Sequence, residues 1–112
     1  MKSMQQTLMS LKDRLVQIQG LKCYHFEKPA KQTAPYAVWA EDGEADAFSA
    51  NNRKEEIQIG GVLDYYTQKE FDAMVDALND ALNEVSSGWT LESIQREEET
   101  KLIHYHWSWS VV

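Results

Sequence analysis

The sequence has few residues of several kinds that whole classes of function require. Its 112 residues include one cysteine, Cys23, and 11 basic against 18 acidic side chains, for a net charge of −7. A single cysteine excludes an intrachain disulfide framework and is in keeping with a reducing compartment. Because proteins grip nucleic-acid phosphates with clustered lysine and arginine, the acidic balance argues against specific nucleic-acid binding.

Long apolar segments are missing too. No apolar run reaches the length that crosses a bilayer, and the first residues, MKSMQQTLMSLKDRL, lack the apolar core of a secretion signal. We therefore expect a cytoplasmic protein without membrane contact. With 43% hydrophobic and 26% charged residues, the chain 1–112 is expected to form a single domain that buries its own core.

Sequence motifs of common enzyme classes are absent. The chain has no G-x-S-x-G, no H-E-x-x-H and no glycine-rich phosphate loop, and Gly60-Gly61 interrupts an apolar run instead of opening a helix. We therefore expect no catalytic residue, no cofactor and no enzymatic activity.

The clearest positive signal is the stretch 55–85, which is typical of a strand followed by a helix. Apolar residues alternate up to Gly60-Gly61, where we expect a bulge or a close backbone approach, and an apolar run follows. Thr67 and Glu70 have the spacing of a capping box, which predicts that the helix begins there. One apolar stripe at helical spacing then runs through Phe71, Met74, Val75, Leu78, Leu82 and Val85, and Gly88 lies where the helix can stop.

The remaining segments predict one more helix and four more strands. We expect a helix over 2–19, ended by Gly20, and strands over 21–26, 36–40, 89–97 and 102–111, with a loop or arm over 41–52. The last strand alternates, so that one face is core and the other carries His104, His106, Ser108 and Ser110. The order α-β-β-β-α-β-β predicts an α+β fold, with two helices packed on one face of a mainly antiparallel four- to five-stranded sheet.

Two pairs of residues have the spacing of metal ligands. Cys23 and His25 lie two apart on the first predicted strand, and His104 and His106 lie two apart on the last. If those strands were neighbours, the four side chains could converge as a zinc site. Histidines that alternate with serines are also typical of a solvent-exposed strand face, and the pairs lack the flanking spacing of zinc modules. We therefore expect no metal and keep these four residues as the candidates if one binds.

Two acidic surfaces are candidates for contacts with a partner. Asp72, Asp76 and Asp80 lie along one side of the predicted second helix, where like charges at this spacing cost about 0.2–0.5 kcal/mol per pair. The segment 41–52 is acidic and is interpreted either as a plain surface loop or as an arm that orders against a neighbour. The four tryptophans and five tyrosines exceed the needs of one small core, and those on an outward face would favour an interface.

The middle of the chain resembles a known protein family. The resemblance lies in Pro35-Tyr36-Ala37-Val38-Trp39, the loop that ends in Ala50-Asn51-Asn52, the strand 55–59, and Gly61-Val62-Leu63-Asp64-Tyr65-Tyr66-Thr67 with Glu70-Phe71-Asp72. These segments are similar to small tail proteins of long-tailed bacteriophages and prophages, the tail-terminator or head-to-tail joining family. The Gly60-Gly61 pair and the tryptophan-rich end of the chain are not features assigned to that family.

The resemblance implies a structural protein of the virion tail that is assembled in the host cytoplasm. Family members form a hexameric ring that ends growth of the tail tube and offers the surface to which the head attaches. The implied partners are further copies of this chain, the tail-tube protein and a head-completion or connector protein, with DNA passing through the ring. The candidate interface residues are Trp39, Glu41, Asp42, Glu44, Asp46, Phe48, Asn51, Asn52, Asp72, Asp76 and Asp80. A cytoplasmic protein-binding adaptor of the same fold and a metal-dependent enzyme remain the alternatives.

Overall fold

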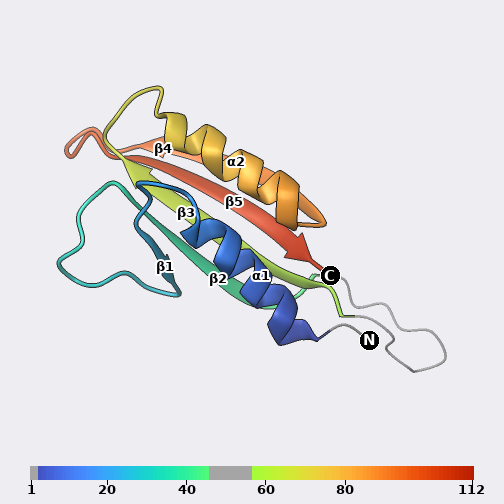
Figure 1. The fold of residues 1–112 in the computed structure, drawn as a ribbon. Helices are drawn as coiled ribbons and strands as arrows, with labels where there is room; N and C mark the ends of the chain where they lie inside the picture. The colour runs from blue at the N-terminus through green and yellow to red at the C-terminus, as the bar shows by residue number, and fades with distance from the viewer. Residues whose placement is uncertain (1–2, 46–56) are drawn as a thin grey trace.

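Two helices and five strands make up the described part of the chain, in the order that the sequence predicts (Figure 1). The computed structural model describes residues 3–45 and 57–112. Its elements are α1 (Met4–Val16), β1 (Cys23–His25), β2 (Tyr36–Glu44), β3 (Ile59–Thr67), α2 (Ala73–Val85), β4 (Gly88–Arg96) and β5 (Ile103–Val111). The strands form one sheet in the order β1-β2-β3-β5-β4, in which only the β1–β2 pair is parallel. The predicted α+β fold is confirmed.

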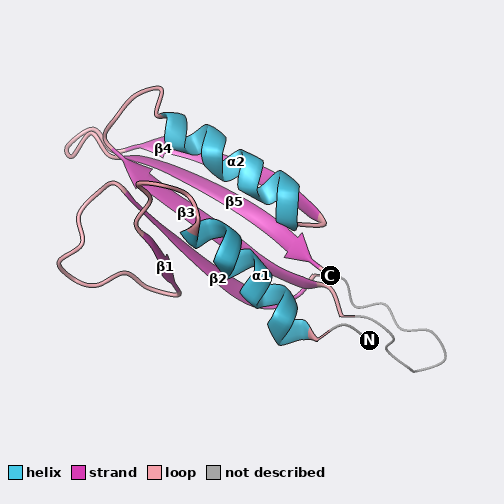
Figure 2. Cartoon of the chain, viewed as in Figure 1, coloured by secondary structure: helices cyan, strands magenta, loops and turns pink. Residues whose placement is uncertain are grey.

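Both helices lie on the same face of the sheet and contact each other (Figure 2). Alternation along each strand sends every second side chain toward them. These side chains form one core with the apolar stripes of the helices, and its fully buried members include Leu11, Leu15, Leu63, Tyr65, Leu78, Leu82, Trp107 and Val111. Two asparagines of α2 anchor tryptophan rings beneath the helix: Asn79 accepts a hydrogen bond from Trp107 Nε1 at 3.0 Å and Asn83 accepts one from Trp89 Nε1 at 2.8 Å.

The start of α2 differs from the prediction. Its N-cap is Asp72, whose carboxylate accepts a hydrogen bond from the backbone N–H of Met74 at 2.9 Å, so the predicted capping box of Thr67 and Glu70 is wrong. The same carboxylate accepts hydrogen bonds from the hydroxyls of Tyr65, at 2.6 Å, and Thr67, at 2.8 Å. Burial alone would raise the pKa of Asp72, but these three hydrogen bonds and Lys69 together hold the pKa below its usual value. Asp72 prevails as the cap because it satisfies three donors and is charged at a helix N-terminus.

Gly61 lies at a position in the sheet where a side chain would not fit. A Cβ at Gly61 would lie 2.3 Å from the ring of Trp109 and 2.3 Å from the backbone oxygen of Ala40. The predicted close backbone approach is therefore confirmed. A bulge is also present, but it lies in β2, between Glu41 and Gly43, opposite the glycine pair.

Several predicted boundaries shift. The strand β2 extends to Glu44, so Glu41, Asp42 and Glu44 belong to a strand and not to a loop, because the β2–β3 pairing continues past the bulge. Asp46, Phe48, Asn51 and Asn52 lie outside the described residues. Gly20 lies in a turn beyond the end of α1, and Gly88 begins β4. Within residues 3–45 and 57–112, no helix is both long and apolar enough to cross a membrane.

Candidate functional site

The face of the sheet opposite the helices, here called the open face, carries the polar side chains with the clearest geometry. No helix covers this face among the described residues (Figure 1). The β3–β5 register places Asp64 opposite His106 and Tyr66 opposite His104. The neighbours of these residues in sequence point into the core, so alternation sends these four side chains to the open face.

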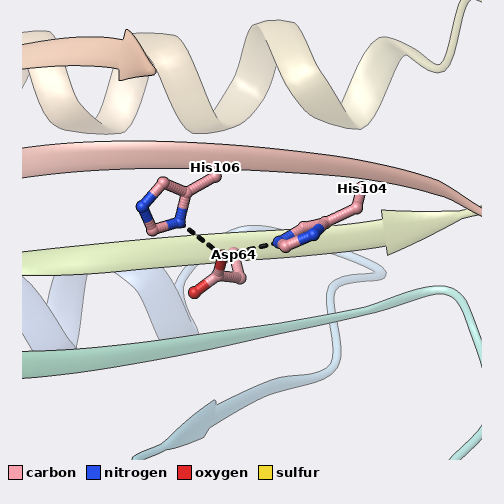
Figure 3. Close-up of side chains that lie close together, drawn as sticks. All are labelled: Asp64, His104 and His106. Atoms are coloured by element: carbon pink, nitrogen blue, oxygen red, sulfur yellow. Dashed lines mark hydrogen bonds and ion pairs between the residues drawn. The ribbon is translucent and has the colours of Figure 1, made fainter. Parts of the chain in front are cut away.

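Asp64, His104 and His106 form a compact cluster there (Figure 3). Nε2 of His104 and Nδ1 of His106 each lie 2.6 Å from the same oxygen, Oδ1 of Asp64. An ionised carboxylate can only accept hydrogen bonds, so each of these ring nitrogens must carry a proton and donate it. The side chains remain 30%, 32% and 19% exposed for His104, His106 and Asp64, so water reaches all three.

A row of stacked rings adjoins the cluster. The ring of Tyr66 stacks on His104 with centroids 4.3 Å apart, and on its other side stacks on Tyr36 at 4.8 Å. Lys28 Nζ lies 5.5 Å from the centre of the Tyr36 ring, within the range of a cation–π contact. Burial, followed by the nearby charge of Asp64, raises the pKa of both tyrosines, so their hydroxyls stay protonated at neutral pH. These rings fix the orientation of His104 from one side.

The structure does not bring the four candidate metal ligands together. β1 lies at the edge of the sheet, and β2 and β3 separate it from β5, so Cys23 and His25 are remote from His104 and His106. His25 instead stacks on Trp39 at 4.0 Å and lies 2.6 Å from a carboxylate oxygen of Glu41. Burial raises the pKa of Cys23 to about 11, so its thiol is neutral at physiological pH and is a weak ligand.

The candidate interface residues fall into three groups. Trp39 is only 3% exposed and belongs to the core, and Asp72 is the helix cap, so these two side chains face their own chain. Asp76 and Asp80 are exposed on α2, and Asp42 and Glu44 are exposed on β2. Glu41 is half-buried beside His25.

The roles of Asp64 and Phe71 differ from what the sequence indicates. Asp64 lies in an apolar run and does not stand out in the sequence as a site residue. A lone carboxylate between Leu63 and Tyr65 is nevertheless unusual in a central strand and could have indicated a functional residue. Phe71 was expected in the apolar stripe of the helix. It instead precedes the N-cap with φ 56 and is 96% exposed.

Comparison with protein-family models and with curated protein sequences found no match for this chain.

Proposed function

We propose that this chain is a structural virion protein that resembles the tail terminators of long-tailed phages. It would act by assembly, as a closed hexameric ring in which each subunit contacts a different surface of the next. The ring would end growth of the tail tube and provide the surface that a head-completion or connector protein binds. Its acidic charge would keep DNA from adhering to the channel during passage.

The observation that carries this proposal is the exposure of Phe71. This residue belongs to the resembling segment, yet its side chain is 96% exposed, so folding of one chain does not account for it. Its φ of 56 is a conformation that is uncommon for a bulky residue. An exposed aromatic ring held in such a conformation is well suited to insert into a neighbouring subunit, since aromatic residues are enriched at interfaces.

The neighbours of Phe71 hold it in place. On its C-terminal side, Asp72 accepts hydrogen bonds from Tyr65 and Thr67, and on its N-terminal side the Lys69 backbone N–H donates to the Thr67 hydroxyl at 3.1 Å. The fold itself therefore requires Tyr65, Thr67 and Asp72, which are also part of the segments that resemble the tail-protein family. Their effect is to present Phe71 at the corner between β3 and α2.

Acidic side chains form the rest of the proposed contact surface. Asp76 and Asp80 are exposed one helical turn apart on α2, with no basic residue in the last turn of that helix. Asp42 and Glu44 are exposed at the far end of β2. A ring subunit that presents acidic patches is expected to meet basic surfaces on its partners, through which the patches would steer association.

A complementation experiment tests the proposal. The gene is deleted from the phage or prophage that encodes it, and plasmid copies of the wild type, Phe71→Asn and Phe26→Asn are supplied. Asparagine tolerates positive φ, so each variant keeps its backbone and loses its ring. Phe26 is the matched control, because it also has positive φ, at 72, is 61% exposed, and lies outside the resemblance.

We expect the deletion to give headless tails of irregular length in electron micrographs. The wild type and Phe26→Asn should restore full particles, whereas Phe71→Asn should not, although its thermal unfolding is unchanged. Tails of normal length joined to heads in the deletion strain would contradict the proposed function. Full rescue by Phe71→Asn would contradict the role of this residue.

A further inference from the structure

We infer that Asp64, His104 and His106 form a binding site for one divalent transition-metal ion, with zinc as the expected ion. This inference does not depend on the proposed function. It rests on a juxtaposition that the sequence spacing alone did not reveal, since the carboxylate comes from β3 and both imidazoles come from β5.

The donor set matches zinc chemistry. Two imidazole nitrogens and one carboxylate oxygen are the protein ligands of many zinc sites that keep a fourth position for water or another ligand. The three donor atoms lie within 4.8 Å of one another. Magnesium and calcium prefer oxygen ligands throughout, so a set with two imidazoles disfavours them.

Small movements would convert the hydrogen-bonded cluster into a coordination site. In a tetrahedral zinc site with bonds of about 2.0–2.1 Å, neighbouring donor atoms lie about 3.3 Å apart. The two nitrogen–oxygen distances of 2.6 Å would each lengthen by about 0.7 Å on this count. The two imidazole nitrogens, which lie within 4.8 Å of each other, would also move to about the same separation. We expect rotation of these partly exposed side chains to supply the changes.

The backbone beneath the site is rigid. β3 is paired on both sides, by β2 and β5, and β5 is paired on both sides, by β3 and β4. The His104 ring is further held by stacking on Tyr66, which itself stacks on Tyr36. A site built on central strands with a supported ring loses little freedom when the ion binds, which favours affinity.

The charge of the chain favours binding of a cation, and the imidazole protons can be accounted for. The net charge of −7 attracts a cation to the surface, and the open face leaves the site accessible to solvent. When neutral rings bind the ion, the proton on His104 Nε2 moves to Nδ1 and the proton on His106 Nδ1 moves to Nε2. The freed lone pairs bind the metal. Two tautomers therefore switch without net proton release.

The test measures zinc binding to tag-free protein by calorimetry, in the wild type and in Asp64→Asn, His104→Gln and His106→Gln. His25→Gln is the matched control, because His25 also lies 2.6 Å from a carboxylate but has no second imidazole beside it. We expect one zinc ion per chain and a loss of zinc affinity of at least about 100-fold in each of the three variants. A loss of this size exceeds what is typical when a residue that only supports a metal ligand is replaced. The control should bind as the wild type does.

Nitrogen-15 NMR spectra of the histidine side chains report the imidazole tautomers in the wild type, so this measurement does not depend on whether any variant folds. Zinc should reverse the tautomers of His104 and His106 and leave His25 unchanged. The inference is overturned if the wild type shows no saturable zinc binding, if the His25 variant loses as much affinity as the His104 variant, or if the two tautomers do not change.

Discussion

The substitution Gly61→Ala tests how β2, β3 and β5 pack at the end of the core. The added Cβ would lie 2.3 Å from the Trp109 ring and 2.3 Å from the Ala40 backbone oxygen. Non-bonded carbon atoms prefer separations of about 3.5–4.0 Å, so the contact with the Trp109 ring is too short by more than about 1 Å, and the contact with the Ala40 oxygen is too close as well. Trp109 is 3% exposed and belongs to the core, so a shift of its ring disturbs the packing around it.

The expected cost follows from this overlap. Overpacking a core typically costs about 1–3 kcal/mol, and here a backbone oxygen and a buried tryptophan must both move, so we expect about 3 kcal/mol. For a domain of this size each kcal/mol lowers the melting temperature by about 4 °C, which predicts a decrease of about 12 °C. Urea unfolding monitored by tryptophan fluorescence gives the free energy directly.

Gly88→Ala is the matched control. A Cβ at Gly88 would meet only Ser110 Oγ, at 3.6 Å, which is an ordinary contact. Its backbone has no positive φ, so alanine should stabilise the chain slightly, by about 0.4–1 kcal/mol, through the unfolded state. If Gly61→Ala unfolds at the same urea concentration as Gly88→Ala, the close packing of Trp109 against Gly61 is refuted.

Two further predictions concern α2. The lowered pKa of Asp72 means that its charged form stabilises the fold above about pH 4 and that this stabilisation is lost as the pH falls through the folded-state pKa. Asparagine in place of Asp72 would keep a capping oxygen but lose the charge that strengthens the hydrogen bonds of this carboxylate at the helix N-terminus, so Asp72→Asn should lower the free energy of unfolding at pH 7 by about 1–2 kcal/mol and flatten its dependence on acid pH. A variant with an unchanged acid slope would refute the role of this carboxylate. Asn79→Ala should cost about 1–3 kcal/mol, because it leaves the fully buried indole N–H of Trp107 without an acceptor. Asn83→Ala should cost less in the same urea titration, because its tryptophan is half-buried, and equal costs would contradict this reading.

Local patterns in the sequence predict much of this fold. The alternation of apolar and polar residues in β5 identifies its two faces, and the stripe that includes Leu78 and Leu82 identifies the buried side of α2. The glycine pair indicates a close approach. Each of these signals depends on neighbours within one element, where periodicity and sterics act directly.

The start of α2 could not be predicted from local pattern alone. Thr67 and Asp72 are both good capping residues, and the choice between them depends on the Tyr65 hydroxyl, which reaches Asp72 only in the folded chain. The same choice removes Phe71 from the helix and exposes it. The position of the cap therefore decides whether Phe71 is a core residue of α2 or an exposed residue before it.

The cluster on the open face depends on strand order. Nothing in the sequence indicates that β5 inserts between β3 and β4, and the pairing of Asp64 with His106 follows from that insertion. The spacing of the histidines identifies them as candidate ligands, but their predicted partners lie on the edge strand β1, which two other strands separate from β5. Long-range pairing decides which side chains meet, and spacing within one strand does not report it.

The most direct test of the proposed function is the position of this chain in purified virions. Electron cryomicroscopy of the phage particles should show a closed ring of this chain between the last ring of the tail tube and the head, with Phe71 buried against the neighbouring subunit. Absence of the chain from the purified particles, or a position elsewhere in them, would contradict the proposal.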